Sequence, residues 1–233
     1  MNSPYEEFER RLQELNNEIF TTISRREEGR EVILDGPINR RVYYDNKPKV
    51  LWLMKEPYDT NGGGWDYETC CKDLQFRRRL AFGQARATWQ PIIYIAHSIR
   101  NQYIPYNAMD SLSKNHSMLE SLDTIAWVNI QKLPSKNITT TDMAHVSQAA
   151  RMYSKFLLKQ IEVLDPDVII CGGTVSILKG FYPDIRKVGE NGTEYLVSGK
   201  RLIIPAYHPA QRTMKRELYV DSLVGHVKYW SER

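Results

Sequence analysis

A short apolar segment that runs directly into reactive polar residues constrains this chain most. Val50 to Leu53 is followed by Met54-Lys55-Glu56-Pro57-Tyr58-Asp59 and then by the glycine-rich stretch 61–64. Short apolar runs that end at proline and glycine are typical of buried strands. Functional groups of α/β proteins lie at the carboxyl ends of such strands, where loops vary without disturbing the core. The segment therefore predicts a buried strand with Glu56 at the functional end.

Two further segments end in the same way. The residues 123–128 lead into Asn129, and the residues 201–207 lead into His208 and Pro209. If all three strands are parallel, their carboxyl ends meet at one edge of a sheet. We therefore expect a carboxylate, a carboxamide and an imidazole to face a common crevice.

The segments between these strands have the spacing of helices. A chain of 233 residues with 42% hydrophobic residues can bury one substantial core, which predicts a single domain over 1–233. Alternating strands and helices favour a three-layer α/β/α sandwich with a mainly parallel central sheet. We expect helices over 5–20, over 89–103 after Pro91, after the turn at 172–174, and over 219–230. A further long helix should begin after Thr140 or Thr141 as its N-cap and end at 164. We also expect a turn at 35–37, a loop followed by a helix over 62–87, a buried strand over 167–171, and a hairpin formed by 194–197 and 201–206.

Several classes of protein are disfavoured by composition. No apolar run approaches the ~18 residues of a membrane span, and Glu6, Glu7 and Glu9 make the first residues too polar for a signal peptide. Three cysteines, at positions 70, 71 and 171, form neither a disulfide framework nor a set of four metal ligands. We expect reduced thiols, a cytoplasmic location, no metal and no cofactor.

The net charge of +4 permits a nucleic-acid partner without demanding one. Basic residues gather at Arg77 to Arg79 and at Arg212, Lys215 and Arg216. Either cluster is equally well explained as a solvated face. Gly172-Gly173-Thr174 lacks the lysine and spacing of a P-loop, so we interpret it as a tight turn from strand to helix.

Each of the three strand-end residues has an ordinary explanation and a functional one. Glu56 is either a surface or capping residue, or a carboxylate held by Pro57 that orients a water or offsets positive charge. His208 is either a structural histidine or a neutral imidazole that donates to an anionic leaving group. Asn129 is either a turn residue or a planar amide that reads one edge of a base.

Four segments, in order, resemble the uracil-DNA glycosylase superfamily over 50–216. Met54 to Asp59 is similar to its Gly-Gln-Asp-Pro-Tyr-His motif, and Val128 to Pro134 to its asparagine-bearing segment. Leu164 to Thr174 looks like its helix–strand–glycine segment, and Tyr207 to Ala210 like its His-Pro-Ser motif. The resemblance implies the same fold and a monofunctional DNA glycosylase that flips a base out of DNA.

The resemblance also implies roles for individual residues. Glu56 takes the place of the catalytic Asp or Asn, Asn129 reads uracil, and His208 bonds the departing uracil anion. The remaining implied contacts are Tyr58 against the thymine methyl, Lys55 in the base pocket, Trp65 or Tyr67 stacked on the flipped base, Arg212 or Met214 in the gap left in the duplex, and Lys215 and Arg216 on phosphates.

The chain departs from the family pattern at several of these positions. Glu56 is one methylene longer than Asp, Met54 and Lys55 replace Gly and Gln, and Ala210 replaces the serine of His-Pro-Ser. Three cysteines also exclude the branch whose iron–sulfur cluster needs four. The expected partner is uracil-containing or mispaired duplex DNA, or single-stranded DNA, bound by a monomer. Two alternatives stay open: a nucleic-acid-binding protein without efficient cleavage, and a hydrolase of free nucleosides or modified bases.

Overall fold

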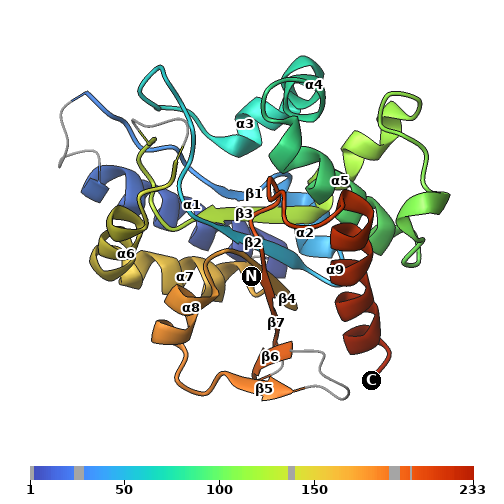
Figure 1. Cartoon of the computed structure of the whole chain (residues 1–233). Helices are drawn as coiled ribbons and strands as arrows, with labels where there is room; N and C mark the ends of the chain where they lie inside the picture. Colours follow the sequence, from blue (N-terminus) through green and yellow to red (C-terminus); the bar gives the residue numbers. More distant parts are fainter. Residues whose placement is uncertain (1–2, 24–28, 136–139, 189–194, 200) are drawn as a thin grey trace.

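The protein is an α/β protein in which one mainly parallel sheet lies between two layers of helices (Figure 1). The computed structural model describes residues 3–23, 29–135, 140–188, 195–199 and 201–233. Within these residues the sheet has seven strands in the order β1-β3-β2-β4-β7-β6-β5. This arrangement confirms the predicted α/β class and is compatible with a three-layer sandwich.

The four central strands, β3, β2, β4 and β7, are parallel to one another, whereas β1, β6 and β5 are antiparallel to their neighbours. All residues of β2, β3 and β4 are buried, as expected for strands covered on both faces. The bounds are β1 Gly36–Pro37, β2 Val50–Met54, β3 Ile125–Asn129, β4 Val168–Gly172, β5 Arg186–Val188, β6 Tyr195–Ser198 and β7 Arg201–Ala206. Residues 194 and 200 of the predicted hairpin lie outside the described residues.

Alternate residues of each strand pack against different helical layers. Trp52 belongs to the core beneath the first layer and Leu51 to the core beneath the second. The first layer contains α3 Tyr67–Lys72, α4 Leu74–Phe82, α5 Arg86–Arg100, η1 Tyr106–Ala108, η2 His116–Thr124 and α9 Arg216–Ser231. The second contains α1 Pro4–Ile23, α2 Arg40–Asp45, α6 Met143–Met152, α7 Ser154–Leu164 and α8 Val175–Phe181.

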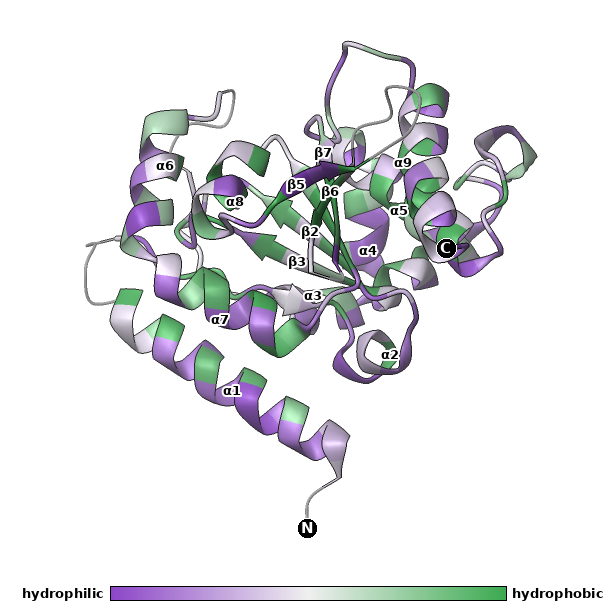
Figure 2. Ribbon diagram, turned by 90° about the horizontal axis from the view of Figure 1, so that it is seen from below, coloured by the Kyte–Doolittle hydropathy of each residue, from purple (hydrophilic) through white to green (hydrophobic). Residues whose placement is uncertain are grey.

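The apolar stripe of α1 shows how sequence spacing sets this packing. Phe8, Leu12, Leu15, Ile19 and Ile23 recur at helical intervals and are all buried. Each such side chain contributes about 1.5–3 kcal/mol when it leaves water. The stripe holds α1 against α7, and Figure 2 shows α1 alternating between green and purple while the central strands are largely green.

Four predictions about elements were wrong. The predicted helix from 140 or 141 to 164 is two helices, α6 and α7, separated at Tyr153, whose ring is buried against α1. The N-cap of α6 is Asp142 rather than Thr140 or Thr141, and its Oδ1 accepts from two backbone N–H groups. Pro91 lies inside α5 rather than before it.

The fourth wrong prediction concerns Gly36 and Pro37, which form edge strand β1 paired with β3, not a turn. Proline is tolerated there because an edge strand needs fewer backbone donors. Helices 4–23 and 216–231 and strand 168–172 agree with the predicted elements. Within the described ranges, no helix is both long and apolar enough to cross a membrane.

Candidate functional site

The parallel register places the three predicted strand ends at one edge of the sheet. Met54 lies opposite Asn129, and Gly172 at the end of β4 lies opposite Ala206. The residues that follow, Glu56 after β2 and His208 after β7, therefore emerge on the same side as Asn129. Because β4 separates β2 from β7, their ends are about 10 Å apart.

His208 is a neutral imidazole with a defined tautomer. Burial, followed by the positive charge of Lys55, lowers the pKa of His208 to about 4. Nδ1 accepts a hydrogen bond from the Ala210 backbone N–H at 3.2 Å, so the ring proton lies on Nε2. No described residue accepts from Nε2. His208 can therefore donate one hydrogen bond to a ligand without supplying a charge.

Glu56 is a half-buried carboxylate at the wall of a cavity of about 610 Å³. Burial raises its pKa, while a hydrogen bond with Thr141 and the charge of Lys55 oppose the rise. Its Oε2 is buried and has no hydrogen-bond partner among the described residues. Such an oxygen is suited to accept from a water or to offset a developing positive charge.

The cavity beside Glu56 is shared with the start of α6 and the segment after β3, not with the other two strand ends. Its lining consists of Arg30, Glu56, Gln131, Leu133, Pro134, Ser135, Thr140, Thr141, Asp142, His145 and Val146. Asn129 and His208 are absent from this lining in the described part of the chain. That Glu56, Asn129 and His208 line one cavity stays a prediction.

Asn129 is fully buried at the end of β3. Its backbone N–H donates to Asp35 at 2.7 Å, and its Oδ1 accepts from Trp127 Nε1 at 3.1 Å. Its Nδ2 meets no hydrogen-bond criterion with a described residue, although the amide lies close enough to the Tyr67 hydroxyl to lower the pKa of Tyr67. An amide carries two N–H groups, and a buried one without an acceptor costs about 1–3 kcal/mol, so the N–H not directed at Tyr67 is a candidate donor to a ligand carbonyl.

Two glycines at the end of β4 leave room for side chains at the end of β2 to extend toward β7. A Cβ on Gly172 would lie 2.6 Å from Met54 Sδ, and one on Gly173 would lie 3.0 Å from Lys55 Cε. Gly173 also has a φ of +79°, which favours glycine. Thr174 then donates to the Leu53 carbonyl, and α8 begins at Val175. The segment forms the predicted turn from strand to helix.

The loop after Tyr58 is shaped by contacts within the protein. Asp59 accepts from the N–H groups of Asn61 and Gly63 and from Trp65 Nε1. A Cβ on Gly63 would lie 2.2 Å from the Glu31 carbonyl oxygen. The glycine at position 63 therefore admits the backbone of a neighbouring segment. Tyr58 is 45% exposed.

The two predicted stacking aromatics lie in an aromatic cluster. Tyr67 is buried and begins α3, with its ring 4.9 Å from Trp65 and stacked on Trp127 at 5.6 Å. Burial raises the pKa of Tyr67, and the nearby Asn129 amide opposes the rise. The cluster thus connects Trp65 and Tyr67 to the candidate base reader through protein contacts.

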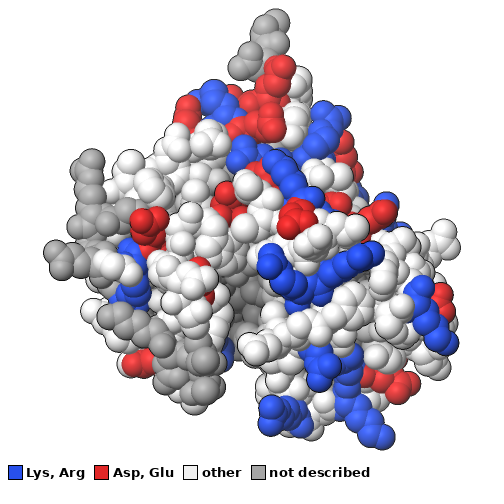
Figure 3. Space-filling model, turned by 90° about the horizontal axis from the view of Figure 1, so that it is seen from above, with Lys and Arg blue, Asp and Glu red and all other residues white. Residues whose placement is uncertain are grey.

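The predicted DNA-binding residues lie at and before the start of α9. Arg212, Lys215 and Arg216 are exposed, and Arg216 donates to Gln90 Oε1. Met214 is partly buried against the core, and its backbone is held by Gln211. Figure 3 shows Lys and Arg at several places on one face around a central hollow, with acidic groups interspersed among them.

The three arginines of the other basic cluster, Arg77 to Arg79, differ in their exposure. Arg77 forms an ion pair with Asp123 at 2.5 Å, with only 12% of its side chain exposed. Arg78 and Arg79 are exposed. Of the two explanations left open, a solvated face therefore does not apply to Arg77.

The sequence did not predict the buried polar network that lies beneath Asn129. Lys132 is fully buried, and its Nζ donates to both oxygens of Asp35, at 2.7 and 2.9 Å, and to Gln160. Gln160 Nε2 also donates to Asp35. Burial lowers the pKa of Lys132, and Asp35 opposes this. The network anchors the backbone of Asn129 through Asp35.

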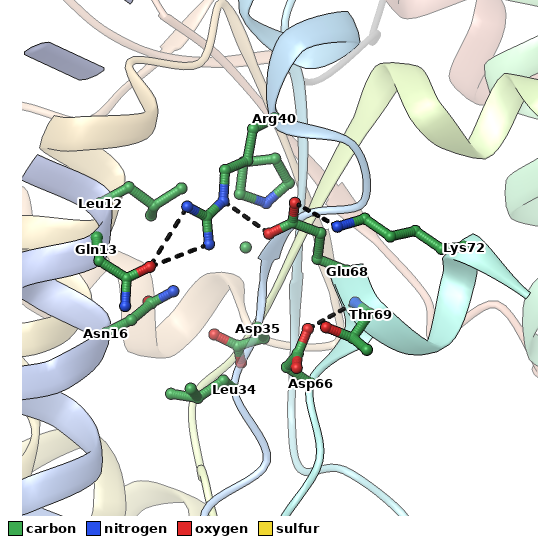
Figure 4. Close-up of a pocket in the computed structure, with 12 residues that line it drawn as sticks. Leu12, Gln13, Asn16, Leu34, Asp35, Arg40, Asp66, Glu68, Thr69 and Lys72 are labelled. Carbon is green, nitrogen blue, oxygen red and sulfur yellow. Dashed lines mark hydrogen bonds and ion pairs between the residues drawn. The ribbon is translucent and has the colours of Figure 1, made fainter. Parts of the chain in front are cut away.

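A second cavity, of about 370 Å³, lies on the other side of Asp35, between α1, α2 and α3 (Figure 4). Arg40 pairs with Glu68 at 2.7 Å, and Lys72 pairs with Glu68 at 3.4 Å. Its main charges are therefore compensated within the protein. In the described ranges, no group of three or more His, Cys, Asp or Glu side chains could hold a metal ion.

Comparisons with known proteins leave the family open: the chain matches no family model, and no curated protein matches it.

Proposed function

We propose that the protein is a monofunctional DNA glycosylase, related to uracil-DNA glycosylases, that cleaves the N-glycosidic bond of uracil or a related deaminated base. The observation that carries the proposal is the neutral imidazole of His208. Its Nε2–H is unpartnered among the described residues, and it lies at the same sheet edge as the Glu56 carboxylate. A hydrogen-bond donor and a carboxylate are what an anionic leaving group and a cation-like sugar require.

The proposed reaction begins with extrusion of the base from the duplex. Extrusion costs a few kcal/mol and costs least at a mispair, so a U·G pair should react faster than a U·A pair. The Asn129 amide donates to a carbonyl of the base through the Nδ2 hydrogen that is not directed at Tyr67. Asn129 Oδ1 already accepts from Trp127, which leaves one lone pair for an N–H of the base.

The bond then breaks with charge developing on both fragments. The electron pair of the C1′–N bond goes to the base, which departs as an anion bonded by His208 Nε2–H. Glu56 orients water toward C1′ and offsets the positive charge on the sugar. The water forms the new C1′–O bond and loses a proton to the carboxylate or to solvent.

An excision screen tests the proposal. Purified protein is incubated with single-stranded DNA and with duplexes containing uracil, hypoxanthine, xanthine or thymine mispairs, and alkali-labile sites are measured on gels. Asn129→Ala and His208→Ala should each lose about 2–4 kcal/mol of transition-state stabilisation, or about 30- to 800-fold in rate. Asn107→Ala and His116→Ala, both exposed, are the matched controls and should retain the wild-type rate.

The same screen separates the alternatives. DNA that is shifted in a gel but never cut would favour a nucleic-acid-binding protein. Turnover of free nucleosides without DNA affinity would favour a nucleoside hydrolase. Full excision by both Asn129→Ala and His208→Ala would remove these residues from the site.

A further inference from the structure

Lys55 occupies a position between the two candidate catalytic groups. It follows β2 directly and precedes Glu56, and its carbonyl accepts from the Gln131 N–H at 2.9 Å, which fixes its backbone. Its side chain extends over Gly173 toward β7: a Cβ at Gly173 would lie 3.0 Å from Lys55 Cε and 3.5 Å from Nζ. A Cβ at position 173 would crowd Lys55 Cε, so the glycine leaves room for this placement.

The ammonium group acts on both neighbours and is paired with neither. After burial, the charge of Lys55 further lowers the pKa of His208, and it opposes the rise in the pKa of Glu56 that burial causes, which places it within electrostatic reach of both. Neither a hydrogen bond nor an ion pair joins Lys55 Nζ to any other described residue. A half-buried lysine without a counter-ion, beside a histidine that stays neutral, is an open site for negative charge.

We propose that Lys55 is a catalytic residue whose ammonium group binds the negative charge that develops on the departing base. This inference rests on the proposed function and assigns a further role within the same site. His208 donates a hydrogen bond but carries no charge at neutral pH, and Lys55 is the cation whose charge acts on His208. Interactions that strengthen as charge develops lower the barrier, whereas interactions of equal strength in the ground state do not.

The step is heterolytic and leaves Lys55 unchanged. The C1′–N bond breaks, its electron pair goes to the ring nitrogen and delocalises onto the exocyclic carbonyl oxygens of the base, and water supplies the oxygen that bonds C1′. Lys55 keeps its proton and forms no covalent bond. The base anion takes a proton from solvent after release.

The chemistry of an ammonium group also predicts the substrate class. Lysine has three N–H donors and no acceptor. It therefore favours a base edge that presents a carbonyl oxygen and disfavours one that presents an amino group. Deaminated bases carry a carbonyl where cytosine and adenine carry an amino group, so we expect keto bases such as uracil or hypoxanthine to be preferred.

Single-turnover excision of uracil and of 5-fluorouracil, each opposite guanine in the same duplex, tests the role of Lys55. Fluorine stabilises the base anion, so its departure depends less on an external charge. Lys55→Met should lose about 100-fold or more with uracil and clearly less with 5-fluorouracil. Lys55→Arg should recover part of the loss. Lys179→Met, which removes an exposed lysine on α8, should match wild type with both substrates.

The outcomes distinguish this inference from the proposed function. Equal losses with both bases, or no loss in Lys55→Met, would overturn the role of Lys55 while excision by the wild type stands. A covalent adduct trapped by borohydride would also overturn it, because the lysine would then act as a nucleophile. If the wild-type protein excises no base from any duplex, both proposals fail together. Urea midpoints of the variants, measured in parallel, exclude loss of folding as the cause.

Discussion

Replacing Lys132 by methionine should destabilise the protein more than replacing any exposed lysine. Lys132 Nζ donates two hydrogen bonds to Asp35 and one to Gln160, and both ion-pair side chains are almost fully buried, at 0% and 1% exposed. Methionine has a similar length but no charge. The substitution leaves the Asp35 carboxylate in the interior with the Asn129 N–H and Gln160 Nε2 as its only donors among the described residues.

The magnitude follows from the uncompensated charge. Removing one partner of a buried ion pair costs about 3–5 kcal/mol, a large part of the ~5–15 kcal/mol that stabilises a domain. With a urea m-value of about 3 kcal/mol/M, the midpoint should fall by about 1–1.7 M. The double variant Asp35→Asn/Lys132→Met should lose less stability than Lys132→Met alone, because Asp35→Asn removes the uncompensated buried charge.

The matched control is Lys159→Met. Lys159 pairs with Glu18 at 2.8 Å, but both side chains are about 40% exposed, at 42% and 39%. Exposed pairs are worth about 0–1 kcal/mol, so this variant should unfold close to the wild-type midpoint. A loss below 1 kcal/mol in Lys132→Met, or a double variant less stable than Lys132→Met, would refute the reasoning.

Three further predictions concern the candidate site. The pKa of His208 is about 4 in the folded protein against 6.5 in the unfolded chain, so the unfolded chain binds more protons between these pH values. The free energy of unfolding should therefore fall by at most about 3 kcal/mol from pH 6.5 to pH 4. Urea unfolding of His208→Asn should lack this pH-dependent component. Burial raises the pKa of Glu56, so the excision rate should decline as acid protonates this carboxylate, with an apparent pKa above 4.5. Glu56→Gln should be slow and should lose this acidic limb of the pH–rate profile. An unchanged acidic limb in Glu56→Gln would exclude Glu56 as the titrating group. Gly172→Ala would place a Cβ 2.6 Å from Met54 Sδ, so it should cost about 1–3 kcal/mol in urea unfolding; Gly180→Ala, where nothing lies within 4 Å, is the control and should not lose stability by this route.

The functional residues at the carboxyl edge of the parallel strands were predictable because each is indicated by a short local stretch of sequence. An apolar run such as Val50 to Leu53 is recognisable without knowledge of its partners, and a polar residue after it must emerge at the carboxyl end. The turn at Gly172 and Gly173 is local in the same sense. The sequence therefore placed Glu56, Asn129 and His208 at strand ends, and the register of β2, β3, β4 and β7 agrees.

The buried network was not predictable because its partners are distant in sequence. Asp35 and Lys132 are 97 positions apart, and a lysine in a polar stretch is ordinarily exposed. Arg77 is similar, since Asp123 lies 46 positions away. Tyr67 was expected to stack on a flipped base, and only the folded structure reveals its contact with Trp127.

The geometry of the sheet edge constrains the shape of any ligand that uses both Glu56 and Asn129. Asn129 contacts Trp127 and Tyr67, which belong to the core beneath the layer of α3 and α5, whereas Glu56 faces the start of α6 in the other layer. Their strands are adjacent, so the two groups are separated mainly across the sheet rather than along it. A ligand that reaches both must enter edge-on between the layers, which favours a flat ring over a bulky chain. An extruded base attached to its sugar meets that requirement, with the ring toward Asn129 and the sugar toward Glu56.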